Sequence, residues 1–217
     1  MRQLPVSLYQ PRFRVELSEG WKRHLISTRV TNGVLPDGGK LLRIILCAAR
    51  VLDPRLPLSF FKSNIREGKL TLPEDAPYVL STFDEYALEM ALQIKDREPS
   101  QITVISLGTF NAKEILRHAL AMGADEAILI KEEQFGELDS FGKARVLSGA
   151  IQTIGEYDLI LCGMQSADLD SGQVGPLISL NLGIPLINVA RKIEVVPEGI
   201  RAERSIEDGI EILESPT

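Results

Sequence analysis

The chain has 217 residues, of which 44% are hydrophobic and 25% are charged, a composition typical of a soluble globular protein with a sizeable core. Its formal net charge of −6 argues against nucleic acid as the main partner, because phosphate contacts need a basic face. No apolar run approaches the roughly 20 residues that cross a bilayer, so we expect no membrane-spanning segment.

The two cysteines, Cys47 and Cys162, each end an apolar run. Buried free thiols fit these positions better than a disulfide and indicate a reducing compartment, so we expect a cytoplasmic protein. No cluster of cysteine and histidine has the spacing of metal ligands, so we expect no bound metal.

Residues 1–40 differ in character from the rest of the chain. They are more basic, show little periodicity and end in the turn-rich stretch NGVLPDGGK. They contain no apolar signal-peptide core, and the acidic residues Glu16 and Glu19 weigh against a transit peptide. We treat 1–40 as an N-terminal extension of uncertain order and 41–217 as the α/β domain.

From Leu42 onward, short aliphatic runs alternate with amphipathic segments. The aliphatic runs are typical of strands buried on both faces, and they cover residues 42–49, 101–108, 126–130, 157–163 and 185–190. The amphipathic segments repeat apolar residues at spacings of three and four, which predicts helices at 81–96, 111–122 and 141–154 and from Pro176 to Gly183. Residues 54–80 between the first strand and the first helix predict an irregular hairpin turning at Glu67 and Gly68.

Capping boxes are predicted for the first two helices, from Thr82 with Glu85 and from Asn111 with Glu114. The alternation of strands and helices predicts an α/β fold, a three-layer α/β/α arrangement around a parallel sheet of Rossmann-like type. After Arg191 the pattern changes, and Pro-Glu-Gly and Asp-Gly turns separate three strands that predict a C-terminal β-meander.

Ligands of open parallel sheets bind beyond the carboxyl ends of the strands. The most informative segment there is the loop SADLDSGQVGPL, in which Gly172 and Gly175 allow a ligand to approach the backbone closely. Pro176 suits the first turn of a helix, so the loop leads to a helix N-terminus that favours phosphate. Asp168 and Asp170 are interpreted as caps of backbone N–H groups or as partners of ribose hydroxyls or an arginine.

The loop has neither of two common nucleotide-binding motifs, GxGxxG or a Walker lysine. The residues alone therefore leave open that it is only a turn between a strand and a helix. Catalytic candidates are few. His118 lies mid-helix and fits a surface role better than catalysis, and His24 lies in the N-terminal extension. No Ser/His/acid trio can be nominated, so any chemistry is expected to belong to a cofactor.

Three stretches together resemble the small (beta) subunit of electron-transfer flavoproteins, the family that includes FixA-type proteins. They are FDEYALEMALQIKD, ITVISLGTFNAKEILRHALAMGADEAILI and DLILCGMQSADLDSGQVGPLISLNLGIP. The resemblance runs from about Leu42 to about Glu214, and the R-ALAMGAD and G-Q--D-D--Q-G patterns are specific in combination. The family's final segment has no counterpart here, so we expect the chain to be truncated at its C-terminus.

The resemblance implies an adenine-nucleotide-binding fold and a heterodimer with an FAD-bearing alpha subunit. The implied cofactor of the beta subunit is AMP in many members and a second FAD in electron-bifurcating ones, with a dehydrogenase, NADH or a quinone- or ferredoxin-linked protein as redox partner. Carried over by residue, the pocket comprises Cys47, Ser81, Thr82, Phe83, Asp84, Leu107, Gly108, Ser166, Ala167, Asp168, Leu169, Asp170, Ser171, Gly172, Gln173, Val174, Gly175, Pro176 and Leu177. These positions fall on four segments: Cys47 onward, LSTFDE before the first helix, SLGTF after the second strand, and the loop after the fourth strand. The sheet argument independently places the same four segments beyond the carboxyl ends of the strands.

Two departures bear on the nucleotide. The family often has Asn-Pro where this chain has Ser81 and Thr82, and the common AMP-type loop has Asn-Gln-Thr-Gly where this chain has SGQVGP. The second departure resembles the bifurcating branch and favours FAD over AMP. Two alternative functions stay open. One is a universal-stress-like nucleotide sensor without a redox partner, and the other is a truncated beta subunit that folds but no longer binds an alpha subunit.

Overall fold

The computed structural model describes residues 12–15, 40–60, 62–64, 69–71, 73, 76–131 and 138–216. Its strands are β1 (Arg12–Val15), β2 (Leu42–Cys47), β3 (Arg50–Leu52), β4 (Lys62–Asn64), β5 (Lys69–Thr71), β6 (Tyr78–Leu80), β7 (Ser100–Gly108), β8 (Glu126–Lys131), β9 (Leu159–Cys162), β10 (Ala190–Val196), β11 (Gly199–Ile206) and β12 (Gly209–Ser215). Its helices are α1 (Thr82–Lys95), α2 (Lys113–Met122), α3 (Ser140–Ile154) and α4 (Val174–Leu182), with short 3₁₀ turns at Leu58–Phe60 and Phe110–Ala112.

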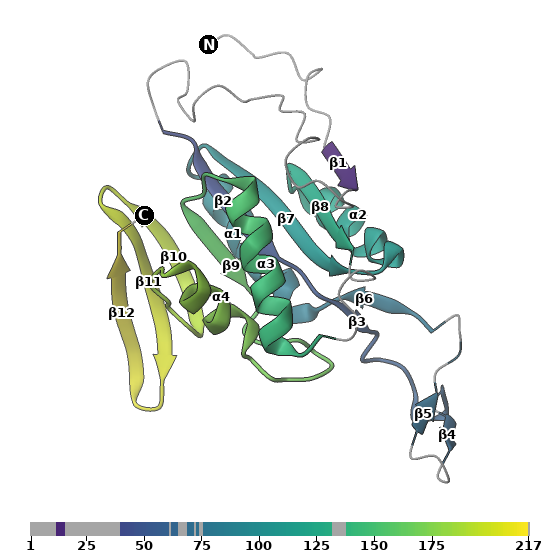
Figure 1. Ribbon diagram of the computed structural model, residues 1–217. Helices are drawn as coiled ribbons and strands as arrows, with labels where there is room; N and C mark the ends of the chain where they lie inside the picture. The colour runs from purple at the N-terminus through teal and green to yellow at the C-terminus, as the bar shows by residue number, and fades with distance from the viewer. Residues whose placement is uncertain are drawn as a thin grey trace.

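The central sheet has the strand order β1-β8-β7-β2-β9, and every neighbouring pair in it is parallel. The chain starts its main sheet at β2, moves outward through β7 and β8, and then returns to place β9 on the other side of β2 (Figure 1). This reversal creates a topological switch point between β2 and β9, where open α/β sheets bind ligands.

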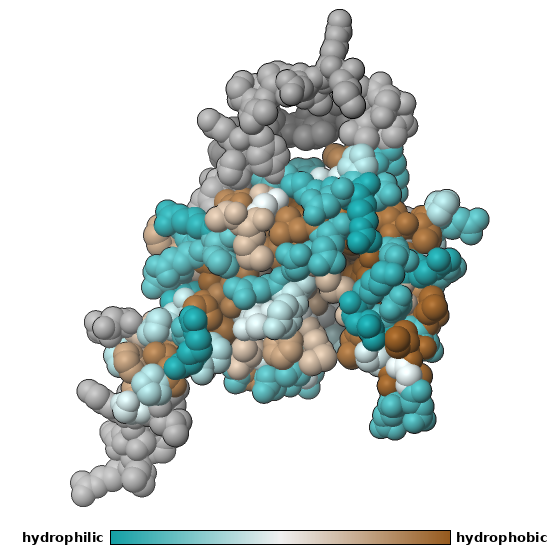
Figure 2. All heavy atoms as spheres, turned by 180° about the vertical axis from the view of Figure 1, so that it is seen from behind, coloured by the Kyte–Doolittle hydropathy of each residue, from teal (hydrophilic) through white to brown (hydrophobic). Residues whose placement is uncertain are grey.

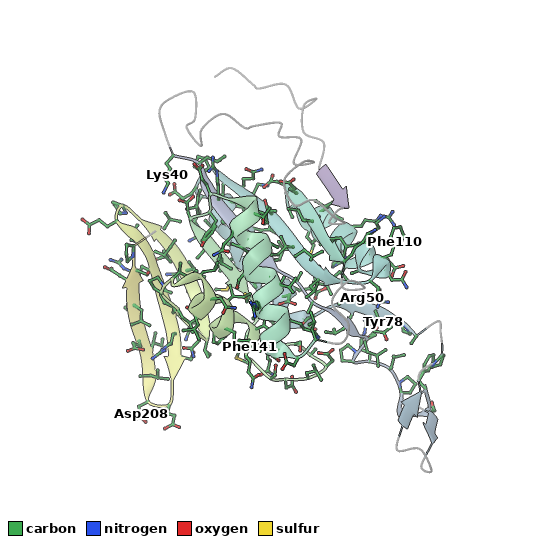
Figure 3. The ribbon with its side chains drawn as sticks, in the orientation of Figure 1. Lys40, Arg50, Tyr78, Phe110, Phe141 and Asp208 are labelled. Carbon is green, nitrogen blue, oxygen red and sulfur yellow. The ribbon has the colours of Figure 1, made fainter. Side chains whose placement is uncertain are left out.

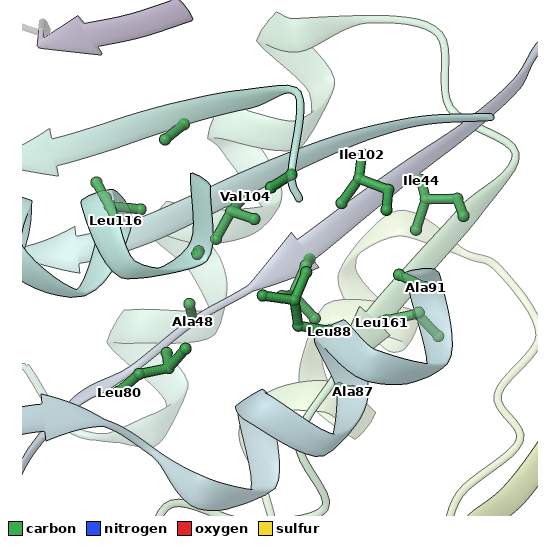
Figure 4. Close-up of a cluster of buried hydrophobic side chains, with 14 of the residues drawn as sticks. Ile44, Ala48, Leu80, Ala87, Leu88, Ala91, Ile102, Val104, Leu116 and Leu161 are labelled. Carbon is green, nitrogen blue, oxygen red and sulfur yellow. The ribbon is translucent and has the colours of Figure 1, made fainter. Parts of the chain in front are cut away.

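Helices cover both faces of the sheet, which confirms the predicted three-layer α/β/α fold. Alternate residues of β2 point to opposite faces, so Ile44 and Leu46 pack under α1 and α2, whereas Ile45 and Cys47 pack under α3 and α4. Figure 4 shows the first of these layers, in which Leu88 of α1 lies against the strands. A strand buried on both faces needs a continuous apolar run, and the sequence LRIILC supplies it.

The C-terminal meander is also confirmed. Strands β10, β11 and β12 form a separate antiparallel sheet at one side of the molecule (Figure 1). Its tip at Asp208 projects away from the body (Figure 3). Seen from behind, this face of the molecule carries hydrophilic side chains interspersed with hydrophobic ones, and the tip of the meander is hydrophilic (Figure 2). No helix within the described ranges is long and apolar enough to cross a membrane.

The predicted fifth strand at residues 185–190 is wrong. The structure places no strand at 185–189, and β10 begins only at Ala190, where it pairs antiparallel with β11. The backbone of Val189 has φ +56°, which breaks an extended run, so the aliphatic residues before it cannot continue into a sheet strand. Edge strand β9 is therefore paired only with β2 among the described strands.

Both predicted capping boxes are wrong. Helix α1 begins after Ser81, whose side chain makes no cap hydrogen bond, and the first-turn N–H groups donate to the Ser81 backbone carbonyl instead. Asn111 lies inside a 3₁₀ turn, and Ala112 precedes α2. The cap that does form was missed: Asp139 accepts from the Gly142 N–H at 2.8 Å at the start of α3.

Two peripheral segments complete the fold. Strands β4 and β5 form the predicted antiparallel hairpin, which extends away from the body in Figure 1. Its expected turn at Glu67 and Gly68 lies outside the described residues. The extension proposed for residues 1–40 is described only at β1 and at Lys40; β1 adds a parallel strand beside β8.

Candidate nucleotide site

A pocket of about 230 Å³ lies at the carboxyl ends of β2 and β9, at the topological switch point. Its floor comes from the strand ends, and its walls come from the first turns of α3 and α4 and from the loop that follows β9. Twelve of the residues selected from the sequence line it: Cys47, Asp84, Leu107, Gly108, Ser166, Asp168, Leu169, Ser171, Gly172, Gln173, Val174 and Gly175. The structure thus brings together parts of all four predicted segments.

The remaining selected residues lie around this pocket without lining it: Ser81, Thr82, Phe83, Ala167, Asp170, Pro176 and Leu177. Ser81 is fully buried, and its backbone N–H donates to the Ala49 carbonyl at 3.0 Å. Asp170 and Pro176 instead line a second cavity of about 560 Å³, which separates the edge of β9 from the meander. Leu177 packs into the core beneath α3 and α4.

Asp84 joins the two strands that flank the switch point. One carboxylate oxygen accepts from the Ala49 N–H at 2.7 Å and the other accepts from the Gly163 N–H at 2.9 Å. These two residues follow β2 and β9, so a side chain from the first turn of α1 fixes the spacing of both strand ends. Through these two backbone hydrogen bonds Asp84 shapes the pocket floor, and it also lines the pocket.

Burial controls the charge of this carboxyl group. Asp84 is only 5% exposed, and burial raises its pKa to about 7, although the hydrogen bonds from Ala49 and Gly163 lower it. The neighbouring charge of Asp168 raises the pKa further. Asp84 therefore changes its protonation near neutral pH, which an exposed aspartate does not do.

Gly163 is required by the close approach of α1. A Cβ atom at this position would lie 2.4 Å from Oδ1 of Asp84 and 2.9 Å from the Phe83 carbonyl carbon. Real Cβ atoms do not tolerate such distances, so only glycine allows β9 to end directly against the first turn of α1. In the sequence, Gly163 is only the last residue of the aliphatic run 157–163, and nothing there indicates this contact.

The two cysteines are free and lie side by side. Cys47 and Cys162 are register partners at the ends of β2 and β9, and both line the pocket. Hydrogen bonding to Cys162 and burial raise the pKa of the Cys47 thiol well above its ordinary value. The structure thus agrees with the expectation of free thiols, and adds that they form part of the pocket floor.

The loop after β9 is held by its own polar residues. Gln165 donates to the Asp170 carboxylate at 2.9 Å, and the Asp170 N–H donates to the Ser166 carbonyl at 3.0 Å. Gly172 has φ +59°, a left-handed conformation that favours glycine. The Asp170 side chain is therefore held by Gln165, a partner that the sequence did not predict, whereas Asp168 lines the pocket and is exposed.

The pocket also contains residues that sequence reasoning missed. The largest omissions are two cations, Arg50 from β3 and Lys143 from α3, together with Ser140 at the start of α3 and Met164 in the loop. Arg50 follows the predicted first strand closely and could have been found from its position. Lys143 could not, because nothing in the sequence indicates which turn of α3 faces the pocket.

Of the two histidines the structure describes only His118, which is not among the described residues that line the pocket. His118 is 54% exposed in its side chain and lies 3.3 Å from the Glu85 carboxylate, so it joins α2 to α1 at the surface, as the sequence predicted. His24 lies outside the described residues.

Comparison with known proteins gives the same family as the resemblance in the sequence. Residues 69–217 match the model of the electron transfer flavoprotein domain. The chain is 41% identical to an electron transfer flavoprotein subunit beta of Thermoanaerobacterium thermosaccharolyticum, over 72% of this chain and 57% of the relative. It is 40% identical to protein FixA of Bradyrhizobium diazoefficiens, over 78% of this chain and 59% of the relative.

A third relative is subunit CarD of the caffeyl-CoA reductase-Etf complex of Acetobacterium woodii, which is 35% identical over 80% of this chain and 64% of its own length. The chain spans less than two thirds of the length of each of these relatives. The family-model match begins after β2 and includes α1, β7, β8, β9, the loop after β9 and the meander. The chain belongs to the electron transfer flavoprotein family, in its branch of beta subunits and FixA proteins.

Proposed function

We propose that this chain binds an adenine nucleotide in the pocket between β2 and β9 and acts with an FAD-bearing alpha subunit as an electron carrier. The observation that carries the proposal is the Gly-rich loop after β9, which leads into the N-terminus of α4 at the switch point of the sheet. Gly175 lies in the first turn of α4, where a Cβ atom would point at the Cys162 side chain, so glycine keeps this wall of the pocket thin.

The residues present fit a nucleotide in their chemistry. The free N–H groups at the start of α4 suit a phosphate, and the exposed carboxylate of Asp168 suits ribose hydroxyls. The apolar surface of Leu107 and Met164 suits the face of a planar ring. A flavin, when bound, would supply the electron chemistry; the chain would supply binding, orientation and a water-poor floor.

Of the two candidate nucleotides, FAD is favoured by the loop sequence SGQVGP, and AMP is the alternative. Two relatives carry the names of a caffeyl-CoA reductase complex and an acryloyl-CoA reductase, which supports a redox enzyme as the second partner. The proposed donor is a dehydrogenase or NADH, and the proposed acceptor is a quinone- or ferredoxin-linked protein. Electron bifurcation is part of this proposal only if the pocket holds FAD.

The test is co-expression of this chain with an alpha subunit of the electron transfer flavoprotein family, followed by purification through a tag on this chain. The expected product is a yellow heterodimer whose acid-released ligands are either two flavins, or one flavin and one AMP, per heterodimer. A colourless preparation that never associates with the large subunit would contradict the electron-carrier proposal. A homodimer that retains AMP or ATP without flavin would favour the nucleotide-sensor alternative.

A further inference from the structure

The two cysteines of the chain form a pair at the ends of two neighbouring strands. Cys47 is the last residue of β2 and Cys162 is the last residue of β9, and these strands run parallel side by side (Figure 1). The two residues are the last register partners of this strand pair. Both side chains pack on the face of the sheet that α3 and α4 cover. The sheet thus brings both thiols of the chain to one point.

The geometry of this pair suits a covalent link. Neighbouring strands lie about 4.8 Å apart, which falls within the roughly 4.4–6.8 Å between Cα atoms that a disulfide spans. The two thiols are free and hydrogen-bond to each other, so their sulfur atoms face one another. Asp84 accepts from the N–H groups of Ala49 and Gly163, which follow the two cysteines, so the strand ends are held at this spacing without a disulfide.

The two thiols differ in their access to solvent. Cys162 is partly exposed and lines both cavities, the pocket at the strand ends and the larger one between β9 and the meander. A Cβ atom at position 175 would lie 3.7 Å from its sulfur, so the glycine there places no side chain over the thiol. Cys47 is only 6% exposed. A small oxidant therefore reaches Cys162 from solvent, whereas Cys47 is reached through its partner.

A disulfide at this position would be open to reduction. Register partners keep their Cβ atoms near the strand spacing of about 4.8 Å, whereas a relaxed disulfide has them about 3.8 Å apart. Closing the bond therefore strains it, and strained disulfides are reduced more easily than structural ones. A small thiol could also attack the bond at the Cys162 sulfur, which lines the cavities.

We propose that Cys47 and Cys162 form a reversible disulfide by exchange with a small disulfide such as oxidised glutathione. In the first step the Cys162 thiolate attacks one sulfur of the small disulfide, whose S–S bond breaks and releases one thiol. In the second step Cys47 loses its proton and attacks the Cys162 sulfur, and the second thiol leaves. The chain gives up two electrons and two protons, and the small disulfide is reduced to two thiols. The pair is thereby a redox modification site that does not depend on what the pocket binds.

The second step should limit the rate. The hydrogen bond with Cys162, burial and the charge of Asp84 raise the pKa of the Cys47 thiol, so little of it is present as thiolate. The hydrogen bond from the Cys162 thiol ends once that sulfur carries the mixed disulfide, which removes the largest of these causes. The mixed disulfide should therefore be a transient species in the unsubstituted chain.

The test is incubation of the purified full chain with oxidised glutathione at mildly alkaline pH, acid quenching, and mass spectrometry of the intact protein and its peptides. We expect the mass to fall by that of two hydrogen atoms, and one peptide pair to join the segments of Cys47 and Cys162. Excess reduced glutathione should restore both thiols. Cys47→Ser should stop at the first step and accumulate one glutathione on Cys162. Cys162→Ser should stay unmodified while folded, because Cys47 is buried.

Matched controls separate exchange within the pair from general thiol oxidation. Thermal melts establish that both serine variants fold, and Cys162→Ser should take up glutathione after denaturation. The joined peptides of the unsubstituted chain decide the proposal even where a variant does not fold. Stable glutathione on Cys162 without an internal disulfide would overturn the proposal, as would a disulfide that links two chains on non-reducing electrophoresis. An internal disulfide that resists excess reduced glutathione would overturn its reversibility.

Discussion

The carboxylate of Asp84 accepts a hydrogen bond from the backbone N–H of Gly163 at 2.9 Å, across 79 residues of sequence. Its other oxygen accepts from Ala49 at 2.7 Å, so one side chain ties the ends of β2 and β9 together beneath the pocket. This arrangement needs a buried acid on α1 and a glycine at the end of β9 at the same time. The pocket floor depends on both residues.

Replacing Gly163 by alanine should destabilise the protein. The new Cβ atom would meet Oδ1 of Asp84 at 2.4 Å, and relief of this overlap would cost roughly 1–3 kcal/mol of unfolding free energy. Urea denaturation measures the change. Gly175→Ala is the matched control, since its Cβ atom would lie 3.4 Å from that of Cys162, an ordinary contact, and should change stability by about 0.5 kcal/mol or less. Equal losses in the two variants would show that the Asp84 contact does not constrain position 163.

The stability contributed by Asp84 should fall as pH rises. Burial raises its pKa from the ordinary value of 3.8 to about 7, so between these values the folded state binds more protons than the unfolded state. The unfolding free energy of the unsubstituted protein, relative to Asp84→Asn, should therefore decrease between pH 4 and pH 7 and level off above about pH 7.

Denaturant titrations at several pH values measure this difference. Asp125 carries a pKa raised by burial to about 6, but it is present in both proteins, so its contribution cancels. Asp208→Asn, at the exposed tip of the meander, serves as the control and should show no such pH dependence. A difference that stays constant across the range would contradict the raised pKa.

The two pocket thiols should differ in reactivity. Cys47 is buried and its thiol has a raised pKa, whereas Cys162 is partly exposed, so iodoacetamide at pH 8 should modify Cys162 first. Cys47 should react only after denaturation. Peptide mass spectrometry locates the modified residue, and a saturating nucleotide should slow the reaction of Cys162, since it lines the same pocket. If Cys47 reacted first in the native protein, its assigned burial would be wrong.

A bulky residue at Gly175 should abolish nucleotide retention. A leucine there would extend from the first turn of α4 toward the Cys162 sulfur, which lies 3.7 Å from the position of the first added atom. Its side chain would occupy the wall where the ligand phosphate is proposed to lie. Acid release and absorbance of the purified heterodimer measure the retained nucleotide, and a melting curve separates loss of binding from loss of fold. Full retention by Gly175→Leu would contradict the proposed position of the loop in binding.

The layers of this protein follow from local patterns along the chain. The aliphatic runs LRIILC and ITVISL are typical of strands buried on both faces, and the three- and four-residue spacings between the runs predict helices on each side. The Pro-Glu-Gly and Asp-Gly turns likewise determined the meander. Local patterns carry this information because burial acts on each segment separately.

How the segments meet depends on contacts between distant parts of the chain. The role of Asp84 depends on backbone N–H groups at Ala49 and Gly163, which lie 35 and 79 residues away in the chain. The position of Lys143 depends on the rotation of α3 about its axis, and the left-handed backbone of Val189 removed the expected fifth strand. These features arise from packing between distant segments, so no local pattern encodes them, and they are the features that shape the pocket.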